Sequence, residues 1–441
     1  MTNATVLHSL HPLGQLEKFR KDPLLFLEEQ ASKHEERVQF RFANRTVHLL
    51  LTPALIKEVL VTQSKSFQKS NQFKELSLLI GEGLVTSEPP VHTKQRKIIQ
   101  PYFTPRHIKK YVSEMIDSAT EMMESWEVNH PRDISKDMMG VTLAVITKTM
   151  FDMNVNEGHE KIGVHMERVL ETATKRIRSF LKPPISWPMP ELKQYKASIQ
   201  ELKRVVEEII QHRESRAEEK EDLLHALLHS RDEDGNCMSR EQLIDEVMTI
   251  FVAGHETTAN LLSWFFYMLQ GNEKVKENVY KEVDRVVGKN ELSSSHLPAL
   301  LYTRQALEET LRLHPPVWMF GRMTVRDVEI GGHPIKKGEN VLISPYIMHR
   351  SKKYFRDPFL FEPERFNRVS AEGNHPYTYL PFGGGSRVCI GNHFALQEAL
   401  IIAALYVQRF NFKMSGDGKV ECHPLITLRP KGGIFMEVEK R

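Results

Sequence analysis

The 441-residue chain has few cysteines, almost no net charge and no long apolar run. Its three cysteines, at positions 237, 389 and 422, are an odd number, which argues against a secreted scaffold held together by disulfides. The net charge of +3 argues against an extended nucleic-acid-binding surface. The apolar stretch at residues 399–407 is far shorter than the ~20 residues of a membrane span, and the N-terminus has no signal-peptide pattern. We therefore expect a cytoplasmic protein without a membrane anchor.

The composition is that of an ordinary globular protein, with 40% hydrophobic and 27% charged residues. Apolar positions at helical spacing predict long helices over residues 193–215 and from residue 239 to residue 268. Strand patterns are few and short, and the clearest is a predicted hairpin over residues 38–51. The sequence thus predicts a mainly α (α+β) fold with small β-sheets. We expect residues 1–441 to form a single large domain, although length alone favours about three domains.

A group of polar residues interrupts the second of these helices, which is otherwise apolar almost all round and is therefore expected in the core. The group is AGHETT at residues 253–258. A glycine inside a helix costs ~1 kcal/mol relative to alanine, and a buried carboxylate requires a partner. Either another group approaches this helix closely and needs an acid and a hydroxyl, or the segment is a solvent-facing patch with a flexible glycine.

The segment YLPFGGGSRVCIGNHFALQEA, residues 379–399, carries the strongest chemical signal. Its three consecutive glycines allow backbone N–H groups to approach a ligand closely. Cys389 comes just before a predicted helix that begins near Gly391 or Asn392, and the helix N-terminus and Arg387 would favour its thiolate. No second cysteine lies at CxxC spacing, so a zinc or iron–sulfur site is not supported. A single thiolate ligand on heme iron fits this pattern, and an inert cysteine beside a glycine-rich turn remains the alternative.

Four motifs in order along the chain resemble those of the cytochrome P450 family of heme-thiolate monooxygenases, in its soluble bacterial type. Residues 382–391 resemble the FxxGxRxCxG heme-binding signature, and AGHETT resembles the oxygen-activation motif on the family's long central helix. Glu309 and Arg312 match the family's ExxR pair, and Arg365, in PERF, matches its meander motif. The signature is matched at Phe382, Gly385, Arg387, Cys389 and Gly391.

The resemblance implies a cytochrome P450 fold, with heme b held between the central helix and the cysteine loop. It implies that Cys389 is the axial ligand of the iron, and that Glu256 and Thr257 deliver protons to dioxygen through water. Ala253 and Gly254 would leave room for oxygen beside the porphyrin. The resemblance further implies that Glu309, Arg312 and Arg365 form a buried structural cluster without a catalytic role.

Cations are also expected around the two heme propionates. His92 and Arg96 match the HxxxR pattern of many bacterial members, although by themselves they would be interpreted as surface residues. Arg322 and Arg387 occupy the positions of two further propionate partners. The walls of the substrate pocket, by position, are expected to be Leu84, Val85, Ile250, Val317, Trp318, Phe320 and Ile426.

The implied function is insertion of one oxygen atom of O2 into a hydrophobic small molecule, by hydroxylation or epoxidation. A fatty acid, a terpenoid, a steroid or a polyketide-like compound would each be admissible. The sequence shows no fused reductase, so we expect electrons from a separate ferredoxin or flavodoxin with its reductase, docking on basic clusters at residues 94–97, 106–110 and 349–356. Two alternatives are an H2O2-dependent peroxygenase and a non-catalytic heme-based binder or sensor; the presence of both Glu256 and Thr257 favours the monooxygenase.

Overall fold

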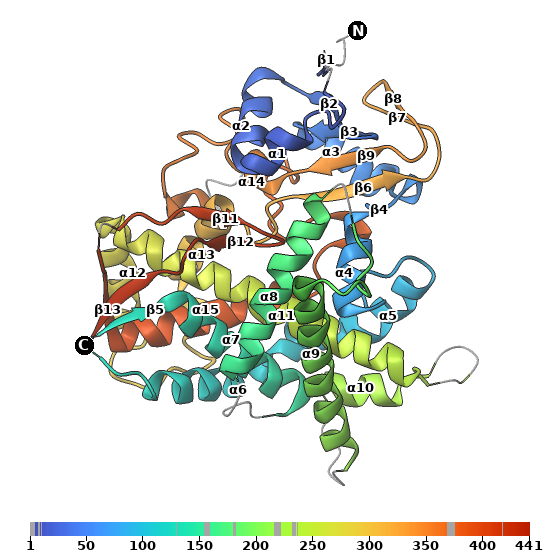
Figure 1. The fold of residues 1–441 in the computed structure, drawn as a ribbon. Helices are drawn as coiled ribbons and strands as arrows, with labels where there is room; N and C mark the ends of the chain where they lie inside the picture. Colours follow the sequence, from blue (N-terminus) through green and yellow to red (C-terminus); the bar gives the residue numbers. More distant parts are fainter. Residues whose placement is uncertain are drawn as a thin grey trace.

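A large helical part and a smaller part built around a β-sheet make up the fold (Figure 1). A computed structural model describes residues 5–7, 9, 11–128, 130–153, 159–179, 182–215, 222–231, 235, 237–367, 375–416 and 418–441. The α-helices are α1 (Leu16–Lys21), α2 (Pro23–Lys33), α3 (Pro53–Lys57), α4 (Gln72–Ile80), α5 (Val91–Ile99), α6 (Pro105–Glu124), α7 (Ile134–Phe151), α8 (His159–Arg178), α9 (Pro190–Glu214), α10 (Leu223–His229), α11 (Arg240–Gln270), α12 (Glu273–Val286), α13 (Leu301–Leu313), α14 (Pro345–Met348) and α15 (Asn392–Arg409).

The β-strands are short and form several small sheets, as the sequence predicts. They are β1 (Thr5–Val6), β2 (Arg37–Phe42), β3 (Arg45–Leu50), β4 (Phe67–Lys69), β5 (Pro131–Asp133), β6 (Phe320–Thr324), β7 (Val328–Ile330), β8 (His333–Ile335), β9 (Asn340–Ile343), β10 (Phe410–Met414), β11 (Cys422–Pro424), β12 (Leu428–Pro430) and β13 (Phe435–Lys440).

The largest sheet has the strand order β1-β2-β3-β9-β6-β4 and lies beside α1 and α2 (Figure 1). β2 and β3 form the predicted hairpin, in register from the pair Arg37 and Leu50 to the pair Phe42 and Arg45. Strands β9 and β6 come from far along the chain: β9 pairs with β3, and β6 pairs with β9. The sheet therefore fastens the N-terminal segment to the second half of the chain.

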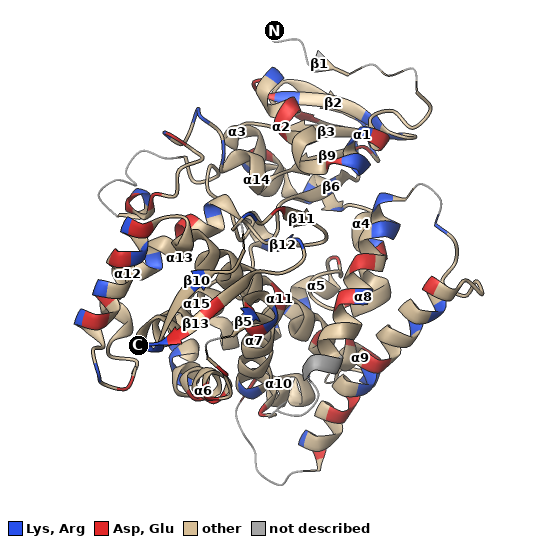
Figure 2. Ribbon diagram, turned by 60° about the vertical axis from the view of Figure 1, so that its left-hand side comes forward, with Lys and Arg blue, Asp and Glu red and all other residues tan. Residues whose placement is uncertain are grey.

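Helix α11 lies in the core, as its apolar pattern predicts, and packs against α7, α13 and α15. It begins after Ser239, whose hydroxyl accepts a hydrogen bond from the Gln242 N–H at 3.2 Å, so the predicted N-cap is present. Lys, Arg, Asp and Glu residues instead mark peripheral helices such as α9 and α12 (Figure 2). None of the helices in the described ranges has the length and hydropathy to cross a lipid bilayer.

Two buried carboxylates near the start of α11 hold the loop at residues 81–87 against the helix. The Asp245 carboxylate accepts a hydrogen bond from the Glu82 N–H at 2.8 Å, and the Glu246 carboxylate accepts one from the Leu84 N–H at 3.1 Å. Glu246 is fully buried, and this burial raises the pKa of its carboxyl group from 4.5 to about 7. Since Leu84 lines the cavity described below, this anchoring positions one of its walls.

The stability of the protein should therefore depend on pH through Glu246. Between pH 4.5 and about 7 the unfolded chain releases a proton from this carboxyl that the folded chain retains, so the contribution of Glu246 to stability falls as pH rises. Relative to Glu246→Gln, the wild type should lose on the order of 2 kcal/mol across that window. Melting temperatures measured against pH check this, with Glu241→Gln, an exposed site on the same helix, as the control. Parallel curves for wild type and Glu246→Gln would contradict the prediction.

Candidate active site

A cavity of about 820 Å³ is lined by α11, by the loop before α15, by the loop after α4 and by parts of the large sheet. The polar group of α11 reaches it through Ala253, Gly254, Glu256 and Thr257. The structure brings all seven predicted pocket walls to the same cavity: Leu84, Val85, Ile250, Val317, Trp318, Phe320 and Ile426.

The Cys389 side chain opens into this cavity from the loop before α15. Its N–H donates a hydrogen bond to the Phe382 carbonyl at 2.9 Å, which closes the loop. Phe382 and Gly391 line the cavity as well, whereas Gly385 does not. Gly385 has φ +70°, and a Cβ on it would lie 2.0 Å from the Leu60 carbonyl oxygen. A glycine is therefore required here because the Leu60 backbone packs closely against the loop, whereas the sequence pattern predicts a close contact with a ligand.

Burial raises the pKa of the Cys389 thiol, while the Gly391 N–H and Arg96 act in the opposite direction. The expectation that Arg387 is the cation beside the thiol is therefore wrong: the cation is Arg96, which donates a hydrogen bond to the Val388 carbonyl at 2.9 Å. A metal ion bound to sulfur would oppose the effect of burial, since coordination deprotonates a thiol.

Basic side chains gather at one side of the cavity with little negative charge beside them. Lys69, His92, Arg96, Arg322 and Arg387 all line it. Lys69 and Arg322 lie directly opposite each other on β4 and β6, an arrangement that is destabilising for like charges. Burial and the neighbouring cations lower the pKa of Lys69 to about 7, that of His92 to about 4 and that of Arg322 to about 10.

Among the described contacts, one carboxylate balances this cluster: Glu88 forms an ion pair with Arg387 and accepts a hydrogen bond from the Lys69 N–H at 2.6 Å. Neither Lys69 nor Glu88 was expected from the sequence. Both are recognised only in the folded structure, where Lys69 lies opposite Arg322 and Glu88 pairs with Arg387. The remaining positive charge calls for additional anions. The two carboxylates of heme b fit here, with a free thiol on the same cavity to hold the iron.

Glu256 is buried beside the C-terminal hairpin of β11 and β12. Its carboxylate forms an ion pair with Arg429 at 2.9 Å and accepts a hydrogen bond from the Thr427 hydroxyl. The neighbouring Thr257 hydroxyl donates a hydrogen bond back to the Ala253 carbonyl at 3.0 Å. Sequence reasoning missed Arg429, which lies in β12, and Thr427, which directly precedes it.

The space beside Gly254 is filled by another helix. A Cβ on this glycine would lie 2.8 Å from the Ile146 side chain of α7, so the glycine permits α7 and α11 to pack closely. Ala253 is the neighbouring small residue whose side chain is exposed to the cavity. The structure thus accounts for Gly254 by helix packing.

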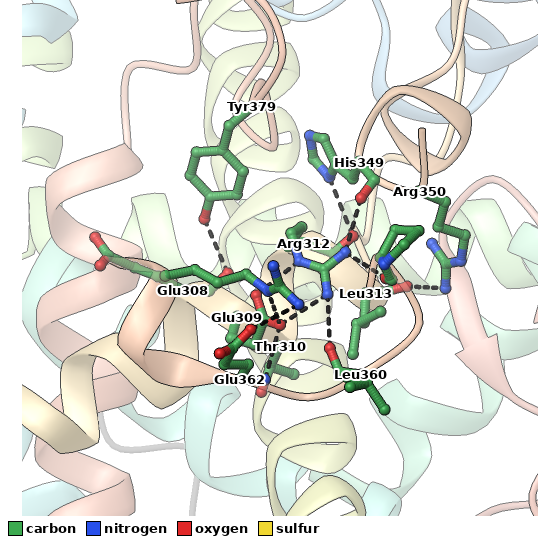
Figure 3. Close-up of polar contacts among 12 residues, drawn as sticks. Glu308, Glu309, Thr310, Arg312, Leu313, His349, Arg350, Leu360, Glu362 and Tyr379 are labelled. Carbon is green, nitrogen blue, oxygen red and sulfur yellow. Dashed lines mark hydrogen bonds and ion pairs between the residues drawn. The ribbon is translucent and has the colours of Figure 1, made fainter. Parts of the chain in front are cut away.

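Glu309, Arg312 and Arg365 meet outside the cavity. Figure 3 shows Glu309 and Arg312 together with His349 and Leu360. Arg312 binds both carboxylate oxygens of Glu309 at 2.7 Å and also donates to the carbonyls of His349, Pro358 and Leu360. Both members of the Glu309–Arg312 pair are 0% exposed.

His349 extends this network to the loop that carries Cys389. Its Nδ1 lies 3.2 Å from the Arg312 carbonyl oxygen, and its Nε2 accepts a hydrogen bond from the Leu380 N–H at 2.9 Å. Tyr379, the residue before Leu380, donates to the Glu308 carbonyl at 3.0 Å. Helix α13 thus fixes the start of the loop nine residues before the cysteine.

A sequence model described as Cytochrome P450 matches residues 5–436 of this chain. The chain belongs to the cytochrome P450 family. It is 31% identical over 412 residues to "Cyclooctatin synthase" of Streptomyces melanosporofaciens, covering 92% of this chain and 89% of that protein. It is 31% identical over 414 residues to "Cyclooctat-9-en-7-ol 5-monooxygenase" of the same organism, covering 93% and 90%. It is 28% identical over 422 residues to "Pentalenene oxygenase" of Streptomyces avermitilis, covering 94% and 92%.

The family and these relatives confirm the predicted fold and reaction class: the chain is a cytochrome P450 monooxygenase that binds heme b. The geometry of this P450 agrees with such a cofactor, since one cavity presents a free thiol and an excess of buried cations.

Replacement of Arg312 should destabilise this P450 severely. Arg312→Ala leaves the Glu309 carboxylate buried without its bidentate partner, which costs about 3–5 kcal/mol of unfolding free energy. Arg365→Ala should cost less, because Arg365 makes one 3.3 Å contact with Glu309 and is partly exposed. Denaturant unfolding of both variants tests this, and equal losses would contradict it.

Proposed function

We propose that Cys389 is the axial ligand of the heme iron, and that Lys69, His92, Arg96, Arg322 and Arg387 bind the heme propionates. The observation that supports this best is the combination of one cavity-facing thiol with a cluster of buried and half-buried basic side chains that has a single carboxylate, Glu88, among its described partners. Heme b, when bound, supplies the redox chemistry that activates dioxygen for insertion of one oxygen atom into the substrate.

Thr257 and Glu256, on the wall formed by α11, would then deliver protons to dioxygen. The Thr257 hydroxyl donates to the Ala253 carbonyl in this structure, so rotation about χ1 would be needed to direct its proton into the cavity. The Glu256 carboxylate is held by Arg429 and Thr427, which fix its position relative to that hydroxyl. In this proposal Arg429 is a positioning residue, acting through Glu256.

The substrate would be a mainly apolar molecule, because predominantly hydrophobic side chains line the cavity away from the cations. Trp318 is buried and its indole N–H donates to the Leu425 carbonyl at 2.9 Å, so it serves as a fixed wall. Two of the three relatives named above are an oxygenase of pentalenene and a monooxygenase of cyclooctat-9-en-7-ol, which favours a terpenoid-like substrate.

Electrons would come from a separate ferredoxin or flavodoxin. Exposed cations at Lys94, Lys97, Arg106, Lys109 and Lys110 surround the helices next to the cysteine loop and suit an acidic partner. The docking face, the single-domain organisation and the cytoplasmic location stay predictions from the sequence.

The ligand assignment is tested by the absorption spectrum of the reduced, CO-bound protein. The wild type should show the red-shifted Soret band of a thiolate-ligated heme, and Cys389→Ala should lose it completely because the sulfur donor is gone. Cys237→Ala and Cys422→Ala are the matched controls and should keep the band. A Cys389→Ala protein that retained this spectrum would show that another residue binds the iron.

The role of Thr257 is tested by how the enzyme uses its reducing equivalents. Thr257→Ala should keep heme and substrate binding but form about tenfold less product per NAD(P)H consumed, with the balance released as hydrogen peroxide. Thr257→Ser retains the hydroxyl and should retain most of the coupling. Product and peroxide yields measure this; unchanged coupling in Thr257→Ala would exclude Thr257 as the proton-delivering hydroxyl.

A further inference from the structure

The charged residues of the cavity are almost all cationic, including some on the wall away from the cluster assigned to the propionates. Within the described residues, Glu256 is the one carboxylate that lines the cavity, and Arg429 already neutralises it. Arg178 and Lys182 line the cavity near the C-terminal end of α8. Lys182 pairs with Glu75 at 3.1 Å, and Arg176 binds the same carboxylate.

Arg178 differs from these neighbours because no carboxylate among the described residues pairs with it. Its guanidinium donates to the Pro424 carbonyl, which leaves most of its five N–H donors without a partner from the described chain. Three buried arginines each bind a carboxylate: Arg176 binds Glu75, Arg213 binds Asp222 and Arg312 binds Glu309. The buried Arg37 does not line the cavity, and its guanidinium contacts His48. Burial lowers the pKa of Arg178 to about 10, and no nearby acid acts against this.

Arg178 also lies apart from the propionate cluster. Lys69, Arg322 and Arg387 act electrostatically on one another, and none of them acts on Arg178. Arg322 is the other cavity-lining arginine with a pKa lowered to about 10 and no carboxylate of its own, and a heme propionate accounts for it. By the same reasoning, Arg178 needs an anionic partner, and the heme propionates are not positioned to be that partner.

The position of Arg178 places this missing anion within reach of the substrate. Thr174 and Arg178 are one turn apart on α8, and both contact the hairpin of β11 and β12. Arg178 donates to the carbonyl of Pro424, the last residue of β11, and the Thr174 hydroxyl accepts a hydrogen bond at 3.1 Å from the N–H of Ile426 in the turn that follows. Leu425 and Ile426 of that turn line the cavity. Thr174 thus already fastens the turn to α8, so the charge of Arg178 is not needed for that purpose.

We propose that Arg178 binds the carboxylate of an otherwise apolar substrate, so that the substrates of this enzyme are hydrophobic acids. This inference rests on the proposed function, in which the same cavity holds heme and substrate. A guanidinium forms two parallel hydrogen bonds with a carboxylate, and such pairs are strong where water is scarce. One charged anchor at the wall and apolar contacts elsewhere would fix which part of the molecule faces Cys389 and Thr257.

Binding to the heme-loaded protein tests this with matched acids and alcohols. The probes are dodecanoate against 1-dodecanol and abietate against abietol, at neutral pH, where the acids are ionised. Dissociation constants are measured by calorimetry and by the change of the heme absorption spectrum. In at least one pair the acid should bind about tenfold tighter than its alcohol, and higher salt should reduce that preference.

The variants separate a charge anchor from a structural clamp. Arg178→Gln should bring the acid-to-alcohol ratio close to one and leave alcohol binding within about twofold, while Arg178→Lys, which keeps the charge, should retain part of the preference. Lys175→Gln removes a cation from the exposed face of the same helix and should change nothing. Equal weakening of acid and alcohol in Arg178→Gln would show a structural role and overturn the proposal.

The proposal is also overturned if neither acid is preferred or bound by the wild type, or if Arg178→Gln keeps the preference. The CO-bound spectrum is recorded on each protein. If the wild type shows the thiolate spectrum but no preference for the acid, only the role of Arg178 is rejected. If the wild type does not show the thiolate spectrum, the proposed function is rejected.

Discussion

Glu309 and Arg312 face each other one turn apart on α13, both excluded from solvent, and Arg312 directs all five of its donors to this carboxylate and to three backbone carbonyls. A buried ion pair is stable only when geometry and additional hydrogen bonds offset its desolvation, and this one meets that requirement. Its partners belong to the segments before the cysteine loop, and through His349 the network reaches Leu380. The position of Cys389 relative to the helical core depends on this contact.

An excess of buried positive charge is the second constraint on the site. Lys69 opposite Arg322 in the sheet, with His92 close by, is an unfavourable arrangement for the protein alone. Negative charge carried by a ligand converts it into a favourable one. In the proposed function, the cation cluster therefore contributes little to the fold and much to the binding of an anionic cofactor. The proposed role of Arg178 follows the same reasoning on another wall of the cavity.

Helix α11 combines a structural and a chemical role in one segment. Its apolar residues place it in the core, while Gly254 admits Ile146 of α7 and Glu256 is held by the C-terminal hairpin. Each residue that is unfavourable in an isolated helix contacts a residue from another segment of the fold. The polar group thus stays in the core because distant segments compensate it.

The linear sequence determined the features that depend on short spacing: the cysteine loop, the capped central helix, the hairpin of β2 and β3, and the Glu309–Arg312 pair. These patterns sufficed for the fold and the reaction class. Only the tertiary structure decided which cations lack a carboxylate and which acids are held. The Glu256–Arg429 pair joins residues 173 positions apart, and the Arg178–Pro424 contact joins residues 246 apart. Such pairings depend on how helices and hairpins pack, and no local spacing encodes that packing.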